Sequence, residues 1–159
     1  MKTTIIVLLL AFNCIAQEKN NNLEKTLDSI SKIQFTKIYQ KDIEGFLSVY
    51  AKNYFDLGND EYVDRKEWKE RLEKYVSSTE FNYFQGKSGD EIVDNSKTKI
   101  YNYDEIKNIK EDINQSKFKL QKNDYLVYIY FRPEYKIGEG GWYGFFRIID
   151  GKWKVVAGD

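Results

Sequence analysis

The side chains of this sequence that could take part in chemistry are carboxylates, tyrosines, lysines and arginines, because the chain has no histidine and only one cysteine. Without histidine, a Ser-His-Asp triad cannot form, and zinc sites made from histidine and cysteine are excluded too. A carboxylate could still act as a general base, and oxygen atoms could still bind a hard cation such as calcium. Any reactive or metal-binding site would therefore be built from oxygen atoms and basic nitrogen atoms.

Asp56 is the acid with the most suggestive position. It ends the predicted strand "YFD" directly before the turn residues Gly58 to Asp60. An aspartate there could face a pocket, or its carboxylate could accept hydrogen bonds from the turn. The segment from Asp56 to Glu67 also places acids at several positions of a calcium loop, but it lacks the glycine at the sixth position and an oxygen side chain at the third. We therefore predict no metal site in this segment.

Arg147 and two glutamates are further candidates. Arg147 is one of four arginines in the chain and lies in the middle of a predicted strand. It could pair with an acid on a neighbouring strand, or it could bind an anionic partner at the surface of the sheet. Glu134 and Glu139 could form a carboxylate pair of the glycosidase type, but acids are so frequent in this chain that their spacing indicates nothing specific.

The overall charge and hydropathy exclude two classes of partner. The chain has 25 basic and 25 acidic residues, so it lacks the excess positive charge that nucleic-acid binding requires. The N-terminal stretch from Ile5 to Phe12 is apolar, but it is much shorter than the roughly 20 residues of a membrane-spanning helix. We therefore predict no nucleic-acid partner and no membrane span.

That apolar stretch instead has the layout of a secretory signal peptide. Lys2 precedes it, and the small residue Ala16 stands directly before Gln17 at the predicted cleavage point. We therefore predict a signal peptide at residues 1–16 and an exported protein, either periplasmic or secreted. The alternative is a lipoprotein in which Cys14 carries the lipid, although the residues at 11–13 (Ala-Phe-Asn) fit such a site poorly.

The remaining chain suits one domain with a core of its own. Residues 17–22 are polar and are expected to be flexible, and residues 23–159 are expected to form the domain. Hydrophobic spacing predicts a helix over 23–38, a second helix over 43–53 with Asp42 as N-cap, and a third helix that begins after Asp64. Two short strands, one on each side of the turn at 58–60, are predicted between the second and third helices.

The middle of the chain, residues 77–124, is difficult to assign. "EFNYFQ" and "KTKIYNY" have strand character, whereas "GDEIVDN" and "DEIKNIKEDI" could be helical turns or irregular. After residue 124 the pattern is clear again, with strands in "YLVYIYFR", "WYGFFRII" and "KWKVVAG". The order of these elements predicts an α+β fold in which helices come first and pack on a curved, mostly antiparallel sheet.

The last two strands form a predicted hairpin around Asp150-Gly151, which is the signature of a type I′ turn. A two-residue turn pairs Ile149 with Lys152 and thereby decides which side chains share a face of the sheet. One face is expected to carry Trp142, Phe146, Ile148, Trp153 and Val155, and the other Tyr143, Phe145, Arg147 and Lys154.

The segment "KDIEGFLSVYAKNYFDLGNDEYVDRKEWKERL", followed much later by "GFFRIIDGKWKVVAG", resembles the nuclear transport factor 2-like superfamily, which includes SnoaL-like cyclases and ketosteroid isomerase. The resemblance covers residues 35–76 and 125–158. It implies helices in the concave face of a cone-like sheet, a conical pocket between them, and dimerisation through the outer face. Because this scaffold carries enzymes, binders and interaction modules, the resemblance alone does not give a function.

The isomerase pattern of that superfamily is not matched. By resemblance, the general base falls on Gly58, the oxyanion tyrosine on Gln34 and the second acid on Gly144. Asp56 could be a base in a shifted register, but it would lack the donors that stabilise a developing oxyanion. Histidine, on which many SnoaL-like and dehydratase members rely, is absent.

We therefore expect an exported, non-catalytic domain that binds a small apolar or amphipathic ligand in the conical pocket, with no cofactor. The alternatives are a protein-interaction module, such as an accessory subunit or an immunity- or inhibitor-type protein, and a carboxylate-dependent isomerase or lyase. The expected ligand-binding residues are Tyr50, Tyr54, Asp56, Trp142, Phe146 and Trp153. The expected interface of a homodimer consists of Tyr128, Tyr130, Tyr143, Phe145 and Arg147.

Overall fold

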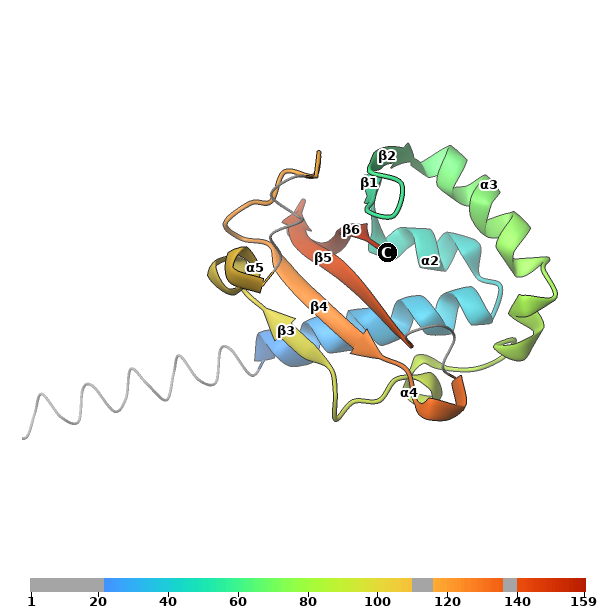
Figure 1. Cartoon of the computed structure of the whole chain (residues 1–159). Helices are drawn as coiled ribbons and strands as arrows, with labels where there is room; N and C mark the ends of the chain where they lie inside the picture. Colours follow the sequence, from blue (N-terminus) through green and yellow to red (C-terminus); the bar gives the residue numbers. More distant parts are fainter. Residues whose placement is uncertain (1–21, 110–115, 136–139) are drawn as a thin grey trace, which may run out of the picture.

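Six strands form one sheet, and helices from the N-terminal half of the chain cover one of its faces (Figure 1). The computed structural model describes residues 22–109, 116–135 and 140–159. The predicted signal peptide at 1–16, which includes Cys14, and residues 17–21 of the expected flexible segment lie outside the described residues. The prediction of an α+β fold, with helices first and a mostly antiparallel sheet, is confirmed.

Outside residues 77–124, the elements follow one another in the order that the sequence pattern suggests. A helix over residues 22–39 comes first. After it come α2 (Ile43–Val49), β1 (Tyr50–Asp56), β2 (Glu61–Asp64), α3 (Arg65–Val76), η1 (Glu80–Tyr83), α4 (Gly89–Ile92), β3 (Lys99–Tyr101), α5 (Tyr103–Ile109), β4 (Tyr125–Tyr130), η3 (Pro133–Tyr135), β5 (Gly141–Ile149) and β6 (Lys152–Gly158).

The strand order across the sheet is β2-β1-β6-β5-β4-β3. All neighbouring strands are antiparallel except β1 and β6, which run parallel. Strand β6 lies between β1, which comes from the first half of the chain, and β5, which directly precedes β6 in the sequence. Asp56 at the end of β1 pairs with Gly158 at the end of β6, so the turn after β1 lies beside the last residues of the sequence.

The helix over residues 22–39 buries a stripe that includes two polar side chains, Ser31 and Gln34. The Ser31 hydroxyl donates to the carbonyl of Leu27 (2.8 Å), and the Gln34 Oε1 accepts a hydrogen bond from the Tyr50 hydroxyl (2.5 Å). Buried polar groups need such partners, because an unpaired one loses its hydration without compensation. The second contact ties the first helix to the start of β1.

Helix α2 ends earlier than predicted. Asp42 caps it as expected, since its carboxylate accepts a hydrogen bond from the Gly45 amide (2.8 Å). The helix stops at Val49, however, and Tyr50 adopts an extended conformation and pairs with Val155 of β6. The predicted helix over 43–53 is therefore wrong in its second half, because pairing with a central strand overrides the helical spacing of the apolar residues.

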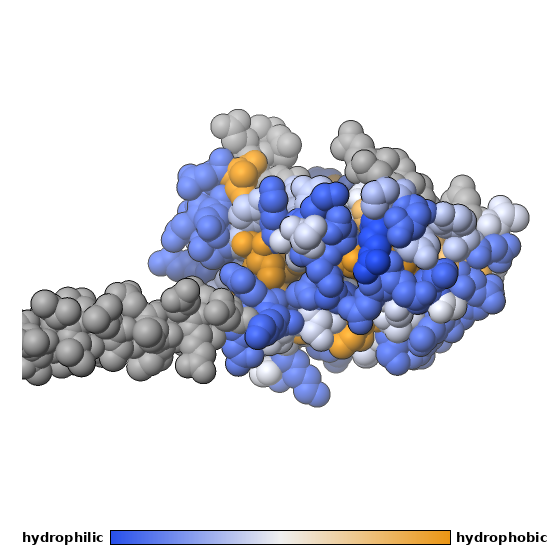
Figure 2. Space-filling view, turned by 90° about the horizontal axis from the view of Figure 1, so that it is seen from below, coloured by the Kyte–Doolittle hydropathy of each residue, from blue (hydrophilic) through white to orange (hydrophobic). Residues whose placement is uncertain are grey.

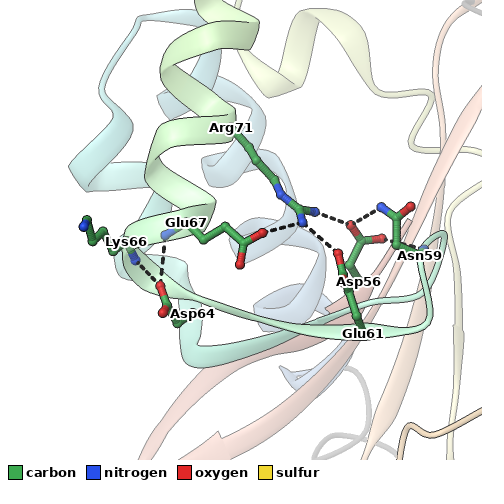
Figure 3. Close-up of polar contacts among 7 residues, drawn as sticks. All are labelled: Asp56, Asn59, Glu61, Asp64, Lys66, Glu67 and Arg71. Atoms are coloured by element: carbon green, nitrogen blue, oxygen red, sulfur yellow. Dashed lines mark hydrogen bonds and ion pairs between the residues drawn. The ribbon is translucent and has the colours of Figure 1, made fainter.

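Asp64 fixes the start of α3. Its carboxylate accepts hydrogen bonds from the amides of Lys66 (2.8 Å) and Glu67 (2.9 Å) (Figure 3). These two amides have no partner within the helix, so the cap satisfies them. The fixed start sets the rotation of α3, and with it the direction in which Trp68 and Arg71 point.

Replacing Asp64 with alanine removes both hydrogen bonds at the start of α3. We expect the free energy of unfolding to fall by about 0.5–2 kcal/mol, as urea denaturation would measure. Lys66→Ala is the matched control, because it shortens an exposed side chain of the same turn and should stay within about 0.5 kcal/mol of the parent. Equal losses in the two variants would contradict the capping role.

The middle of the chain contains short elements instead of long strands. The stretch "EFNYFQ" is not the predicted strand but contains η1. Phe81 and Phe84 both point into the core that faces the helices, which helical spacing allows and strand alternation does not. Of "KTKIYNY" only Lys99–Tyr101 forms a strand. The segments "GDEIVDN" and "DEIKNIKEDI", for which helical turns and irregular structure were both left open, contribute to the short helices α4 and α5.

The C-terminal hairpin has the predicted turn and pairing. Asp150 and Gly151 have positive φ angles of 50° and 73°, and Ile149 pairs with Lys152. Positive φ at both central residues is the requirement of a type I′ turn, and glycine meets it without strain. A bulge between Phe145 and Phe146 changes the register before the strands reach their other end.

The two faces of the sheet carry two separate cores. One core faces the helices and includes Phe146 and Val155 of the hairpin. The other, which we call the outer-face core, contains Phe55, Ile106, Phe118, Leu126, Phe145, Val156 and Ala157. Ile106 belongs to α5 and Phe118 to the segment before β4, so the formerly unassigned middle of the chain covers the outer face of the sheet.

The face of the molecule seen in Figure 2 is mostly hydrophilic, and its apolar side chains form small separate patches. The large apolar side chains that are exposed, Ile33, Tyr62, Tyr83, Ile109 and Ile148, come from different parts of the chain. Isolated exposed apolar residues are normal on a protein surface. Among the residues that the structure describes, no helix combines the length and the apolar character that a membrane span needs.

Candidate functional site

A cavity of about 660 Å³ lies between the helices and one end of the sheet. The helix over 22–39, α2 and α3 form its walls on one side, and β1, β5 and β6 on the other. On the strand side it reaches Gly141 and Trp142 at the start of β5 and Gly158 at the end of β6. Sites for small molecules typically measure about 300–1,000 Å³, so the cavity has a suitable size.

Four aromatic side chains line the cavity together, and we call them the aromatic wall: Phe46, Tyr50, Tyr54 and Trp68. The rings of Tyr54 and Trp68 are stacked, with centroids 5.2 Å apart and an interplanar angle of 13°. Tyr50 meets Tyr54 edge-on at 5.0 Å and stacks on Phe46 at 4.6 Å. These residues come from α2, β1 and α3, so three elements must pack correctly to form one surface.

A second group of rings lines the opposite part of the cavity. Phe35 from the first helix meets Trp142 of β5 edge-on at 5.8 Å and Phe131 at 5.3 Å. Tyr39 lies one helical turn after Phe35, and the two rings are stacked at 6.2 Å. Edge-on and offset contacts of this kind stabilise aromatic clusters beyond the burial of their area. The interior of the cavity is therefore mostly aromatic.

The mouth of the cavity, in contrast, is polar and is formed by Asp56, Gly58, Asn59, Arg71 and Asp159. Gly58, Asn59 and Asp159 are exposed to solvent, so the cavity opens to solvent on this side. Gly58 belongs to the turn between β1 and β2, and Asp159 follows β6. The parallel pairing of β1 with β6 brings these two segments together.

Asp56 and Arg71 are the centre of an ion-pair network at the mouth (Figure 3). The Asp56 Oδ2 accepts hydrogen bonds from Arg71 Nη1 (2.9 Å) and Asn59 Nδ2 (2.8 Å), and its Oδ1 accepts one from the Asn59 amide (3.2 Å). The Nη2 of Arg71 donates to Glu61 (2.7 Å) and Glu67 (2.6 Å). These hydrogen bonds to Glu61 and Glu67 raise the pKa of the Arg71 guanidinium above its usual value.

Asp56 both stabilises the turn and faces the cavity, so the two interpretations of this residue are compatible. Its carboxylate stabilises the turn through Asn59, as aspartate before a turn commonly does. It also lines the cavity. Arg71, which sequence reasoning did not select, is the residue that joins the turn to α3.

Two tyrosine hydroxyls at the cavity, those of Tyr50 and Tyr54, are neutral. Burial, and then the negative charges of Asp56 and Asp159, raise the pKa of Tyr54 well above its usual range. Burial also raises the pKa of Tyr50, whose hydroxyl donates to Gln34 Oε1. Neither phenol loses its proton near neutral pH, so neither can act as a base there. Among the described residues, two buried donors in this region have no partner, Gln34 Nε2 and Trp68 Nε1.

Of the six expected ligand-binding residues, Tyr50, Tyr54, Asp56 and Trp142 line the cavity. Phe146 and Trp153 lie outside it, because the cavity is at the opposite end of the C-terminal hairpin from the turn. Phe146 is fully buried and pairs with Val155, and Trp153 packs edge-on against Tyr125 at 5.7 Å. Both therefore belong to the core beside the cavity and not to its surface.

Several residues of the cavity were absent from the expected set, although the sequence contained a signal for some of them. Trp68, Leu72 and Tyr75 lie on one face of α3 at helical spacing, and all three line the cavity. Their spacing indicated a buried face of the helix. The spacing of apolar residues cannot show whether a buried face of a helix packs against other side chains or borders a cavity.

The outer face is largely covered by the chain itself. Phe145 is fully buried against Phe118, with ring centroids 5.1 Å apart, so it cannot contact a second subunit in this structure. Arg147 pairs with an acid, as the first of its two alternatives expected, but this acid, Asp124, lies directly before β4 and not on a strand (2.6 and 2.7 Å). Arg147 also donates to the Lys119 carbonyl (3.0 Å). The segment before β4 therefore occupies the place that the homodimer prediction gave to a partner.

The three remaining residues of the expected interface are half-buried tyrosines on β4 and β5. Tyr128 and Tyr143 are stacked at 5.2 Å, and Tyr128 and Tyr130 border a hollow of about 210 Å³ together with Tyr101 and Ile109. The homodimer itself stays a prediction.

Of the three positions that the isomerase pattern gives, Gly58 lines the cavity, whereas Gln34 and Gly144 do not. Gln34 is buried, Gly58 is in the exposed turn and Gly144 is inside β5. Glu134 is exposed on η3, and Glu139 lies outside the described residues. Within 22–109, 116–135 and 140–159, no group of three or more histidine, cysteine, aspartate or glutamate residues is arranged to hold a metal ion.

Comparisons of the chain with protein-family models, with curated proteins and with solved structures found no match.

Proposed function

We propose that this protein binds a small apolar or amphipathic molecule in its aromatic cavity and does not transform it. The observation that carries this proposal is the cavity of about 660 Å³, whose interior is lined by rings from the helices and the sheet. Such a surface gains free energy when it leaves water, roughly 25 cal/mol for each Å² of apolar area. A molecule with an apolar body and a polar end matches the aromatic interior and the charged mouth.

The proposal that the protein is a member of the nuclear transport factor 2-like superfamily is supported by the arrangement of its elements. Helices come first along the chain, and the C-terminal hairpin β5–β6 lies in the middle of the sheet. The cavity lies between those helices and the sheet, where the resemblance implies a conical pocket. Export through a signal peptide at residues 1–16 is part of the same proposal and is supported by the N-terminal sequence pattern.

A non-catalytic role is supported by the state of the polar groups at the cavity. The carboxylate of Asp56 already accepts hydrogen bonds from Arg71 and Asn59, so its Oδ2 is occupied by partners within the protein. Tyr50 and Tyr54 stay neutral for the reasons given above. A general base would need to be free and within reach of donors that stabilise a developing oxyanion.

The alternative of a protein-interaction module predicts a filled cavity and an exposed aromatic patch. The cavity is hollow, and the outer-face core is covered by α5 and the segment around Phe118. These two observations favour the ligand-binding proposal over the interaction module.

A variant that closes the mouth would test the proposal. A Cβ at Gly58 would lie 3.1 Å from Asp159 Oδ1 and 3.4 Å from Asp56 Oδ1, so a side chain there projects among the mouth residues. We expect the neutral probe N-phenyl-1-naphthylamine to become fluorescent on binding to the parent and to Gly58→Ala. Gly58→Trp should bind it at least about tenfold more weakly, because the indole obstructs the entrance.

Circular dichroism and urea denaturation of the two Gly58 variants serve as controls for folding. The comparison is clean because alanine adds only the Cβ at the same position. Probe fluorescence that rises equally in the parent, Gly58→Ala and Gly58→Trp would mean that the probe binds elsewhere, and the proposed site would be wrong. No fluorescence change in the parent would contradict apolar ligand binding for this class of molecule.

A further inference from the structure

We propose that the molecule bound in this cavity carries a positively charged nitrogen, an ammonium group, which is held at the mouth between the aromatic wall and the carboxylates of Asp56 and Asp159. The proposal rests on the ligand-binding function proposed above and specifies the chemical class of the ligand. It commits to an organic cation with an apolar body, and not to a metal ion.

The first argument is the charge balance at the mouth. Two acids, Asp56 and Asp159, and one basic residue, Arg71, line the cavity. The guanidinium of Arg71 is shared among three carboxylates, those of Asp56, Glu61 and Glu67. One positive charge therefore faces three negative charges before Asp159 is counted, so the mouth has an excess of negative charge.

The second argument is that the side-chain carboxylate of Asp159 is available to a ligand. Among the residues that the structure describes, its carboxylate has no hydrogen-bond or ion-pair partner, whereas its backbone pairs with Tyr143. Its Oδ1 would lie 3.1 Å from a Cβ at Gly58, and the Asp56 Oδ1 would lie 3.4 Å from the same point, so both carboxylates border one small volume. The carboxylate of Asp159 is thus an acceptor at the mouth that matches a donor or a cation on the ligand.

The third argument is the position of the aromatic wall relative to these charges. Tyr54 stacks on Trp68, and a Cβ at Gly158, next to Asp159, would lie 2.9 Å from the Tyr54 hydroxyl. The negative charges of Asp56 and Asp159 both act on that hydroxyl. Aromatic faces attract ammonium groups, and the attraction is strongest for tryptophan and where water is excluded. Rings and carboxylates at one place therefore favour an organic cation over an anion or a neutral head group.

Two probes of the same shape but different charge would test this inference. Phenyltrimethylammonium has a positively charged nitrogen atom at the position where tert-butylbenzene has a neutral carbon atom. We would measure how each displaces N-phenyl-1-naphthylamine from the intact protein at low salt. We expect the cation to bind at least about fivefold more tightly than its neutral analogue, although water solvates the cation far better. This preference should decrease as the salt concentration rises.

Variants that each remove one negative charge would show which carboxylates cause the preference for the cation. We expect Asp159→Asn to weaken binding of the cation by about fivefold and to leave binding of tert-butylbenzene unchanged. Asp56→Asn should do the same and should also lower the stability of the turn, which urea denaturation would record, because Asp56 accepts hydrogen bonds from Asn59. Asp150→Asn is the matched control: it removes the same charge at the hairpin turn, away from the cavity, at a position where asparagine tolerates the positive φ.

The outcomes separate this inference from the function on which it rests. If the neutral analogue binds as tightly as the cation, or if the cation keeps its advantage in both Asp159→Asn and Asp56→Asn, the ammonium assignment is overturned while ligand binding stands. If neither compound nor the naphthylamine probe binds, the proposed function fails and this inference fails with it. The ligand-binding function and the ammonium assignment are both supported if the protein prefers the cation and if Asp159→Asn and Asp56→Asn, but not Asp150→Asn, remove this preference.

Discussion

Asp124→Asn is expected to lower the free energy of unfolding by about 3 kcal/mol, near the lower limit of the 3–5 kcal/mol typical when one partner of a buried ion pair is removed. The carboxylate of Asp124 is 0% exposed and accepts hydrogen bonds from Arg147 at 2.6 and 2.7 Å. Asparagine has the same size but no charge, so Arg147 would remain largely buried without its counter-charge. The side chain of Arg147 is 20% exposed, which allows some hydration and places the expected loss at the lower limit.

The same substitution also affects the segment that covers the outer face. Asp124 Oδ2 accepts a hydrogen bond from the Gln121 amide (2.8 Å), and Arg147 donates to the Lys119 carbonyl. The ion pair therefore holds the chain before β4 against β5. We expect limited proteolysis to cut this segment faster in Asp124→Asn than in the parent, since local opening exposes its backbone.

Two comparisons make the Asp124 prediction specific. Asp150→Asn removes a charge from an exposed turn and should change the free energy of unfolding by less than about 0.5 kcal/mol. The double variant Asp124→Leu/Arg147→Leu should lose less than Asp124→Asn alone, because it leaves no unpaired buried charge. A loss below about 1 kcal/mol in Asp124→Asn would mean that the pair is hydrated in solution and does not hold the segment in place.

Phe145→Ala is expected to have an equal or larger effect, a loss of about 3–5 kcal/mol in the free energy of unfolding. The ring of Phe145 is fully buried at the centre of the outer-face core and contacts Phe118 at 5.1 Å. Its removal leaves a cavity between the sheet and the covering segment. Urea denaturation of the parent and the variant would measure the loss.

Ile148→Ala is the matched control for Phe145→Ala, because Ile148 lies on the same strand but is 52% exposed. It should change the free energy of unfolding by less than about 0.5 kcal/mol. If Phe145→Ala cost no more than this control, the covering segment would not be packed on the outer face. The face would then be free for a second subunit, as the homodimer prediction requires.

The parts of the fold that could be predicted are those that depend on neighbouring residues. Asp42 caps its helix as expected, the third helix begins after Asp64 as expected, and Asp150-Gly151 forms the predicted turn. A cap and a two-residue turn are determined by hydrogen bonds and φ angles within four or five consecutive residues. The register of the hairpin follows from its turn for the same reason.

The candidate site could be predicted only in part. Strand alternation placed Trp142, Phe146 and Trp153 on one face of the sheet, and all three do belong to the core that faces the helices. Alternation says nothing, however, about position along the strand. The cavity lies at the end of the hairpin that is far from its turn, so Trp142 lines it and the other two do not.

The composition of the chain, its caps, its hairpin and the absence of histidine follow directly from the sequence, because each depends on residue types or on short-range geometry. The end of α2 at Val49, the covering of the outer face by the segment around Phe118, and the meeting of Asp56 with Arg71 are decided by the tertiary structure. Each of these joins segments far apart in the chain. Their energies compete with local preferences, and the competition is resolved only when the whole sheet is assembled and its two faces are buried.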